Sequence, residues 1–362
     1  MKTELLLALE QLEKEKGLSI DMLFDVIEDA MVKAYKNNFG ATHNVEVELN
    51  RETGDITVYS IRLIVDEVID EATQVSLEEA KAINPEYESG DVLREKVTPK
   101  DFGRIAAQSA KQVVVQKIRE AERGVIYDEF SSRESEIVNG VIHRVSKGIV
   151  YITLGRTEAL MAANEQIPHE EYIQGARIKT VITEVKNSTK GPQIFVSRTH
   201  PGLVKRLFEL EVPEIYDGEV EIKSISREPG SRTKIAVYSS NPDLDPVGAC
   251  VGPKGHRVQN IVEELQGEKI DIIEWNENPA ILISNALNPS KVMRVEVDED
   301  DNSALVVVPD YQLSLAIGKE GQNARLAAKL TGWKIDIKSE TQYIAYLKDI
   351  GEYEDVYGDD AQ

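Results

Sequence analysis

The chain has 362 residues, with 42 Lys and Arg against 64 Asp and Glu, and a formal net charge of -22. So acidic a balance excludes broad, charge-driven binding of nucleic acid, although a locally basic segment could still bind RNA. The length exceeds what one hydrophobic core usually supports, so several domains are expected. A single cysteine, Cys250, excludes an intrachain disulfide. Because no apolar run is long enough to span a membrane, a cytoplasmic protein without a membrane partner is expected.

The charge is unevenly distributed along the chain. Residues 135–200 hold eight basic and six acidic side chains, and they form the one segment with a positive balance. Residues 1–134 and 201–343 are net acidic. Residues 344–362 hold one Lys and six acidic side chains, and they are predicted to form an acidic tail.

Residues 1–125 have the pattern of an α/β domain. Two helices are predicted within residues 1–38, with Ser19 as N-cap of the second. Alternating residues at 44–49 and 55–60 predict a β-hairpin, and Ser76 is predicted to cap a short helix. A long helix is expected over residues 101–123, and a linker over residues 126–134.

Residues 135–200 change to short strands separated by glycine-containing turns. Strands are predicted over residues 138–145, 150–154, 177–185 and 193–197. Several short strands in so few residues indicate a small OB-fold β-barrel.

An internal repeat occupies residues 201–276 and 277–343. Each copy has the predicted order helix, strand, strand, two helices, strand, and ends in Lys-Ile-Asp-Ile, beginning at Lys269 and at Lys334. Because the agreement extends over a whole unit, the two copies are predicted to share one α+β fold.

Each copy holds a Gly-x-x-Gly loop between its two short helices: Gly252-Pro253-Lys254-Gly255 and Gly318-Lys319-Glu320-Gly321. Paired glycines let a backbone approach a ligand closely, and the next helix offers free N–H groups to phosphate oxygens. This pattern is typical of the KH clamp for single-stranded RNA or DNA. The alternative is an ordinary corner between helices, which two copies in matching frames disfavour.

Over nearly its whole length the chain resembles the bacterial NusA family of transcription elongation and termination factors. The resemblance rests on three segments: the predicted helix from Lys111 to Arg123, residues 251–258 and residues 315–325. The resemblance implies a polymerase-binding N-terminal domain, an S-one-type OB barrel and two tandem type II KH domains, in a short form of the family. It also implies three classes of partner: core RNA polymerase, nascent single-stranded RNA with its hairpins, and other Nus-type elongation factors.

The candidate RNA-binding residues lie in the two loops and in the helix starts that follow them. They are Gly252, Pro253, Lys254, Gly255, His256 and Arg257 in the first copy, and Gly318, Lys319, Glu320, Gly321, Gln322, Asn323 and Arg325 in the second. Because a carboxylate opposes phosphate binding, the loop with Glu320 is expected to contribute less affinity than the loop with Lys254.

Two further sets of candidates are weaker. In the barrel, Arg144, Lys147, Arg177 and Lys186 are expected to make electrostatic RNA contacts, and Tyr151 is either a stacking surface or a core residue. The family resemblance implies that Arg104 and Lys111 touch an RNA hairpin. The alternative for these two residues is a solvated helix face.

No sequence pattern indicates catalysis, a metal site or a cofactor. The five histidines and one cysteine have no metal-ligand spacing, and no Walker A sequence is present. The alternative function is an RNA-degrading enzyme of the polynucleotide phosphorylase type, which also combines KH and S-one-type domains. A ribosome-associated KH protein is a third possibility. Nothing in the sequence demands a dimer, so a monomer is expected.

Overall fold

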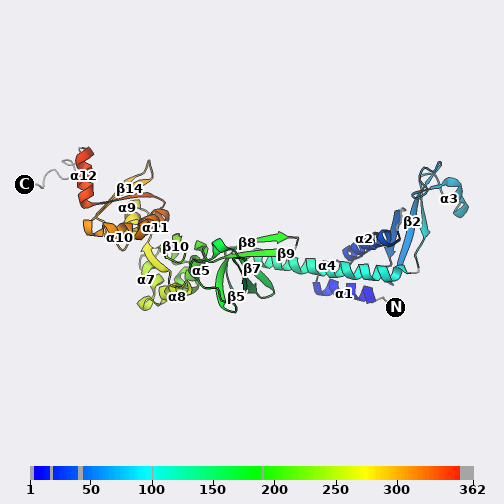
Figure 1. Ribbon diagram of the computed structural model, residues 1–362, viewed down its shortest axis with the longest axis horizontal. Helices are drawn as coiled ribbons and strands as arrows, with labels where there is room; N and C mark the ends of the chain where they lie inside the picture. The colour runs from blue at the N-terminus through cyan, green and yellow to red at the C-terminus, as the bar shows by residue number, and fades with distance from the viewer. Residues whose placement is uncertain (1–3, 17–18, 40–43, 100, 190, 351–362) are drawn as a thin grey trace, which may run out of the picture. The chain divides into compact units, whose positions relative to one another are not determined.

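The computed structural model describes residues 4–16, 19–39, 44–99, 101–189 and 191–350 (Figure 1). The chain divides into two compact units, residues 1–128 and residues 129–362. Each unit has its own hydrophobic core. Among the helices described, none combines the length and the apolar character needed to cross a membrane.

The N-terminal unit packs helices on a four-stranded sheet in which β2 pairs with β1, β3 and β4. Its helices are α1 (Glu4–Lys16), α2 (Ile20–Phe39), α3 (Leu77–Ile83) and α4 (Phe102–Ser131). Its strands are β1 (Asn44–Leu49), β2 (Ile56–Val65), β3 (Gln74–Ser76) and β4 (Val92–Lys96). The predicted hairpin is β1 paired antiparallel with β2. Strands β3 and β4 were not predicted.

Local sequence explains where these elements begin and end. The Asn50 side chain accepts hydrogen bonds from two backbone N–H groups of the β1–β2 turn, and Gly54 takes the positive φ of 76° that closes it. Ser76 caps α3 as predicted, because its hydroxyl accepts from the Glu79 N–H. Helix α2 buries Leu23 and Ile27 in the main core of this unit.

Helix α4 is longer than the sequence pattern predicted. It continues to Ser131, so most of the predicted linker 126–134 is helical. Residues 124–131 contain one glycine and no proline, and nothing in them forces the helix to end. Phe102, Ala106 and Ala110 bury one face of the helix in the N-terminal core.

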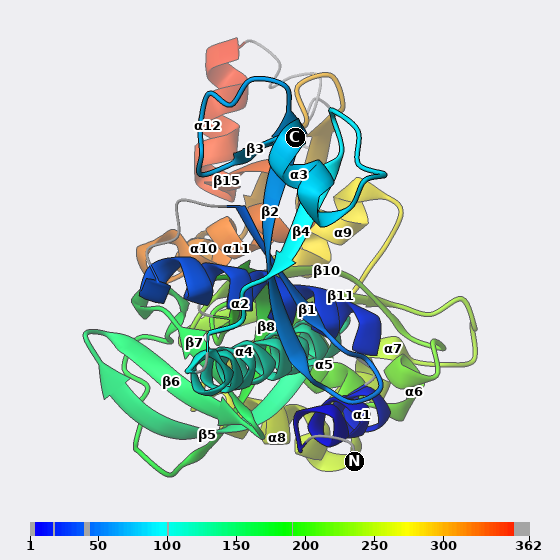
Figure 2. The same ribbon diagram turned by 90° about the vertical axis from the view of Figure 1, so that its right-hand side faces the viewer.

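The second unit begins with a closed five-stranded barrel, in which the strand order is β5-β6-β7-β9-β8. Its strands β5 and β6 lie side by side in Figure 2. Its strands are β5 (Ile137–Ser146), β6 (Ile149–Leu154), β7 (Thr157–Met161), β8 (Arg177–Ser188) and β9 (Gly191–Ser197), with a 3-10 turn η1 (Ala163–Glu165). The OB-fold barrel is confirmed, although β7 was missed. A Cβ on Gly140 would lie 2.2 Å from Ile152, so the barrel wall needs glycine there.

The two KH units follow, each with a three-stranded sheet. The first contains α5 (Pro201–Glu211), α6 (Pro213–Tyr216), β10 (Glu221–Glu228), β11 (Arg232–Tyr238), α7 (Pro246–Val251), η2 (Pro253–Gly255), α8 (His256–Glu264) and β12 (Lys269–Glu274). The second contains α9 (Pro279–Ala286), β13 (Arg294–Asp298), β14 (Ser303–Val308), η3 (Asp310–Gln312), α10 (Leu313–Ile317), η4 (Lys319–Gly321), α11 (Gln322–Thr331) and β15 (Lys334–Ser339). In both sheets the middle strand pairs antiparallel with the first strand and parallel with the last.

Each of the two sheets is packed by the helix that follows its last strand. Helix α9 packs Leu282 and Ile283 against Ala236 and Ile273 of the first sheet, which joins the two KH units through one buried cluster. A final helix, α12 (Glu340–Ile350), packs on the second sheet in the same way, through Tyr343 and Leu347.

Helix α12 corrects the predicted acidic tail. Residues 344–350 are helical, and Leu347 is only 2% exposed because it packs on the second sheet. The part of the tail predicted over residues 351–362 lies outside the residues that the structure describes.

Candidate nucleic-acid interface

The two Gly-x-x-Gly loops have nearly identical backbones. Gly252 and Gly318 both have φ near 75° and ψ near 175°, a conformation that only glycine adopts readily. The third residue of each loop, Lys254 or Glu320, has φ near 54°, and the closing glycine is left-handed again. Positive φ angles at three of the four loop positions turn the chain directly from one short helix into the next.

The first glycine of each loop is also required by packing. A Cβ on Gly252 would lie 2.7 Å from the Arg257 side chain, and a Cβ on Gly318 would lie 2.8 Å from the backbone nitrogen of Asn323. The loops therefore press against the first turn of the following helix, α8 or α11. A ligand on the outer side of either loop would meet backbone with no Cβ between.

In the first loop Pro253 and Lys254 are exposed, and so is His256 at the start of α8. Arg257, which is predicted to bind RNA, also makes contacts within its own KH unit. Its guanidinium donates to Glu214 at 2.9 Å and to the carbonyl oxygen of Ala249 at 2.6 Å. Lys254 in the loop and His256 at the start of α8 are the side chains with nitrogen groups that are most exposed here.

In the second loop Lys319 and Glu320 are exposed, but the following helix start is engaged with the rest of the protein. Asn323 is buried and donates to the carbonyl oxygens of Leu287 and Ala316. Its side-chain oxygen has no hydrogen-bond partner in the described structure.

Gln322 and Arg325 contact the first KH unit. Both donate to the carboxylate of Glu228, the last residue of β10, at 2.8 Å. The hydrogen bond from Arg325 lowers the pKa of Glu228, and burial only partly opposes the shift. The second loop is thus fixed against the first KH sheet by a charged contact.

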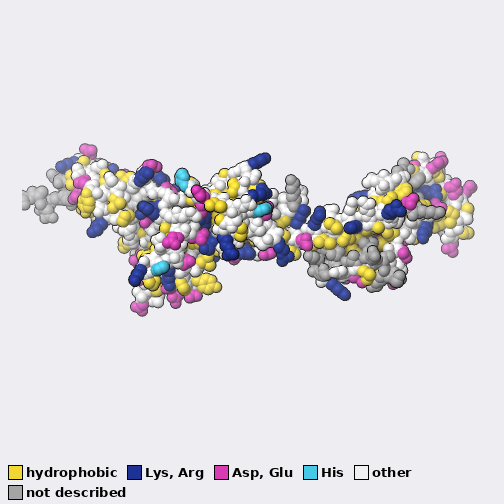
Figure 3. Space-filling view, turned by 60° about the horizontal axis from the view of Figure 1, so that its bottom comes forward, with side chains coloured by type: hydrophobic (Ala, Val, Ile, Leu, Met, Phe, Trp, Pro, Cys, Tyr) yellow, Lys and Arg dark blue, Asp and Glu magenta, His cyan; other side chains and the backbone are white. Residues whose placement is uncertain are grey.

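The barrel places its candidate residues on its outer surface. Strand β6 buries Val150 and Ile152 and turns Tyr151 outward, so Tyr151 is not a core residue of the barrel. The Arg144 guanidinium lies 3.4 Å from the centre of the Tyr151 ring, a stacked cation–π pair. Lys147, Arg177 and Lys186 are exposed. Figure 3 shows Lys and Arg side chains gathered over the part of the chain that forms the barrel.

In the N-terminal unit, Arg104 and Lys111 are both exposed on α4. They lie seven residues apart, or about two turns, and so share one face of the helix. Ala106 and Ala110 face the core, on the opposite side. Both cations are therefore accessible to a ligand.

A buried ionic cluster at the junction of the barrel and the first KH unit was not predicted. Arg198, 1% exposed, donates to the carboxylate of Glu170 in the barrel and to that of Glu264 in α8. It also donates to two carbonyl oxygens, those of Lys179 and Glu264, each at 2.9 Å. A lone arginine at the end of a strand gives no sequence signal of this role, because its partners are 28 and 66 residues away.

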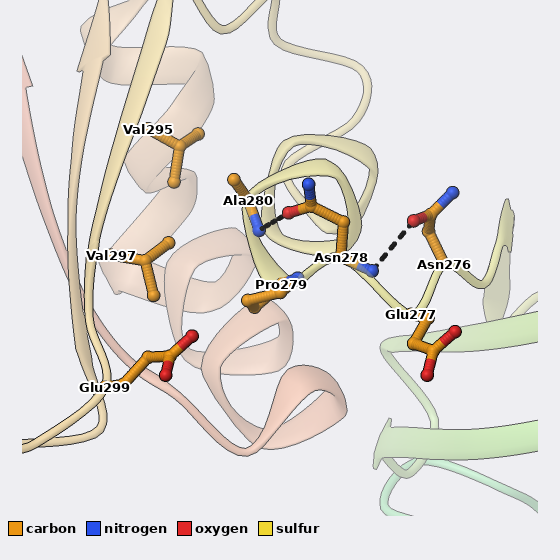
Figure 4. Close-up of a pocket in the computed structure, with 8 residues that line it drawn as sticks. All are labelled: Asn276, Glu277, Asn278, Pro279, Ala280, Val295, Val297 and Glu299. Atoms are coloured by element: carbon orange, nitrogen blue, oxygen red, sulfur yellow. Dashed lines mark hydrogen bonds between the residues drawn. The ribbon is translucent and has the colours of Figure 1, made fainter.

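The pocket in Figure 4 lies between the link that joins the two KH units and strand β13. Asn276 and Asn278 organise the link, since their side chains accept from backbone N–H groups at 2.9 Å. The residues that line the pocket include Glu277 and Glu299 and no Lys or Arg. This pocket is therefore poorly suited to a phosphate. Among the described residues, no group of three His, Cys, Asp or Glu side chains could hold a metal ion.

Comparisons with known proteins agree with this architecture. Family models described as NusA N-terminal domain, NusA-like first KH domain and NusA-like second KH domain match residues 4–124, 198–275 and 279–344. A solution structure of the N-terminal domain of NusA from B. subtilis is 58% identical. It covers 34% of this chain and 99% of that chain, with a TM-score of 0.32.

Curated relatives match over most of the chain. The transcription termination/antitermination protein NusA of Bacillus subtilis is 61% identical over 341 residues, which cover 94% of this chain and 92% of that protein. The protein of the same name from Mycobacterium tuberculosis is 45% identical, and the match covers 92% of each chain. The polynucleotide phosphorylase alternative is not favoured. On these matches the chain belongs to the NusA family of transcription termination and antitermination proteins.

Proposed function

We propose that this factor binds core RNA polymerase through residues 1–125 and nascent single-stranded RNA through residues 135–343. By holding RNA as it emerges, it would favour or oppose hairpin formation and so alter pausing, termination and antitermination. The action is mechanical and electrostatic, and no bond is made or broken. Other elongation factors of the Nus type would join the same complex.

The proposal that this chain binds RNA rests on the matched pair of glycine loops. Both loops combine a positive-φ glycine backbone, an exposed lysine and a following helix start. Such a loop grips the sugar-phosphate backbone of about four nucleotides. Because the whole chain is acidic, this affinity depends on local geometry, and it should fall as salt rises.

The barrel and helix α4 would add weaker contacts. Arg144 and Tyr151 form one stacked, exposed surface, while Lys147, Arg177 and Lys186 add positive charge to the same barrel. Arg104 and Lys111 on α4 would meet an RNA hairpin while the N-terminal unit is bound to polymerase.

The polymerase part is tested by co-purification with core RNA polymerase. The full chain is expected to remain bound through a size-exclusion column, whereas a chain lacking residues 1–125 is expected to elute separately. The deletion variant should still bind RNA, because the barrel and KH units form a separate compact unit. Retention of polymerase by the deletion variant would overturn the assignment of residues 1–125.

A second assay separates binding from catalysis. Incubation of the full chain with labelled RNA and inorganic phosphate is expected to leave the RNA intact. Release of nucleoside diphosphates would restore the RNA-degrading alternative.

A further inference from the structure

The second KH unit contains an open cleft between the link that joins the two KH units and strand β13 (Figure 4). The cleft has a volume of about 660 Å³. Glu277 stands on the side of the link and Glu299 on the side of β13, and both are exposed. The walls also include four apolar, partly buried residues: Pro279, Ala280, Val295 and Val297. An apolar centre with an exposed, charged surround is typical of a site where a protein docks.

The internal repeat identifies the corresponding place in the first KH unit. Helices α5 and α9 both begin at a proline, and the residue before it, His200 or Asn278, accepts a hydrogen bond from the N–H two residues further on. The strand registers of the two sheets align Arg227 of β10 with Val297 of β13. The cleft beside α9 and β13 therefore corresponds to the space beside α5 and β10.

In the first KH unit this space is filled. The Arg227 guanidinium reaches from β10 to the start of α5, where it donates to the carbonyl oxygen of His200 at 2.9 Å. Ile167 of the barrel is 4% exposed and belongs to the same buried cluster as the apolar residues of α5. It packs so closely on the β10–β11 turn that a Cβ on Gly230 would lie 2.6 Å from it. Val297 has neither the length nor the donor groups of Arg227, so the second unit keeps a cleft here.

The charge around this place is reversed between the two units. In the first unit Arg198, at the edge of the barrel, pairs with the carboxylate of Glu170 in the barrel. Asn276 stands at the position of Arg198 in the second unit, and the charged residues beside it are Glu277 and Glu299. Neither carboxylate has an ion-pair partner among the described residues. A partner that fits the second unit would therefore bring positive charge where the barrel brings negative charge.

We propose that this cleft docks a protein partner through a loop that carries an aliphatic residue beside a lysine or arginine. The aliphatic side chain would pack on Val297 as Ile167 packs on the first unit, and the cation would pair with Glu277 or Glu299. RNA is disfavoured as the occupant, because these carboxylates repel phosphate. A second copy of this chain is disfavoured as well, because its own loop around Ile167 is buried and carries Glu170 in place of a cation. The site goes beyond the proposed function, since it requires no RNA.

The test uses the full chain and a peptide that copies residues 164–172 of the barrel with its charge reversed. Three glutamates become lysine in this basic peptide: Glu165→Lys, Glu170→Lys and Glu171→Lys. The unchanged, acidic sequence is the control peptide. In an NMR titration that follows labelled alanine and valine methyl groups, the basic peptide is expected to shift the signals of Ala280, Val295 and Val297 until they saturate. The acidic peptide should leave these signals in place.

Charge reversal in the cleft should reverse this preference. Glu277→Lys combined with Glu299→Lys is expected to weaken binding of the basic peptide about tenfold or more and to admit the acidic peptide. The matched control is Glu86→Lys combined with Glu88→Lys, which changes the net charge equally at two exposed positions of the N-terminal unit and should have no effect.

A second change tests the aliphatic contact. Replacing Ile167 by Ser in the basic peptide keeps its charge and should weaken binding about tenfold or more, the effect of losing one buried aliphatic side chain. Equal binding of the two basic peptides would mean that charge alone attracts them, and it would overturn the proposed fit.

The remaining outcomes decide the site as a whole. Binding of the basic peptide that survives charge reversal in the cleft would overturn the proposal. So would a gain in RNA affinity on charge reversal without any binding of peptide, because the two carboxylates would then act only as a barrier to RNA. Neither the peptides nor these variants change the glycine loops, so failure here would leave the proposed RNA-binding function standing.

Discussion

The two KH loops have the same backbone but different supports. The first loop is held within its own unit, where Arg257 contacts Glu214 and the carbonyl of Ala249. The second is held across the boundary between units, where Arg325 contacts Glu228. The two copies of the KH fold therefore have the same loop conformation, but different contacts hold each loop in place. The second loop depends on the first KH sheet, and the first loop has no matching dependence in the contacts described.

The largest expected difference concerns the first glycine of each loop. We expect Gly318→Ala to lower the free energy of unfolding by about 3 kcal/mol, because the new Cβ meets backbone at 2.8 Å and φ is positive. Gly252→Ala should cost less, about 1–2 kcal/mol, because the flexible Arg257 side chain can move.

Urea unfolding followed by tryptophan fluorescence measures both variants, since Trp275 and Trp333, the two tryptophans of the chain, lie in the KH region. Gly321→Ala is the control, because its nearest neighbour is a side-chain nitrogen at an ordinary 3.6 Å. A larger loss for Gly252→Ala than for Gly318→Ala would contradict the packing argument.

The loops should also differ in RNA affinity. Replacing both Pro253 and Lys254 by Asp removes one positive charge and adds two negative ones, so we expect RNA binding to weaken by about tenfold or more. The same change at Lys319 and Glu320 starts from a loop that already holds a carboxylate, and it should cost less. A filter-binding titration at one salt concentration measures both. Equal losses would refute the difference between the loops.

The repeat, the loops and the barrel could be predicted from the sequence because each depends on local spacing. The contacts that hold these elements in place could not be predicted from the sequence. Gln322, Asn323 and Arg325 have the residue types of an RNA site, yet Asn323 is buried and the other two contact Glu228, nearly one hundred residues earlier. Likewise, Leu347 lies among Ile344, Tyr346 and Ile350, just before an acidic stretch. Its packing partners are in the second sheet, far away in the sequence, and residues 344–350 were mistaken for part of a tail.

A smaller effect is expected from the contact across the KH boundary. Glu228→Gln keeps the shape of the side chain but removes the charge that Arg325 contacts, so the second loop should be held less firmly. Because the pKa of Glu228 is lowered below its ordinary 4.5, the contact stabilises the fold above that pH and is lost as the pH falls further.

The thermal midpoint of the wild type should therefore drop more steeply below pH 4.5 than that of the variant. Glu221→Gln is the matched control, since its partner Lys223 lies two residues away on the same strand. If Glu228→Gln and the wild type have parallel pH profiles, the charged contact does not stabilise the arrangement of the two units.

The smallest expected effect comes from Cys250, whose counterpart in the second unit is Ala316. Both side chains are fully buried at the same place in the fold, so Cys250→Ala should lower the free energy of unfolding by about 1 kcal/mol or less and leave RNA affinity unchanged.

Burial, reinforced by the charge of Glu214, raises the pKa of the Cys250 thiol to about 12. The folded protein therefore holds almost no thiolate at pH 8 and should react with a thiol reagent only when the first KH unit opens. Gly252→Ala should speed that labelling more than Gly318→Ala does, because the first loop has its supports within its own unit. The reverse order would mean that the first unit opens only together with the second.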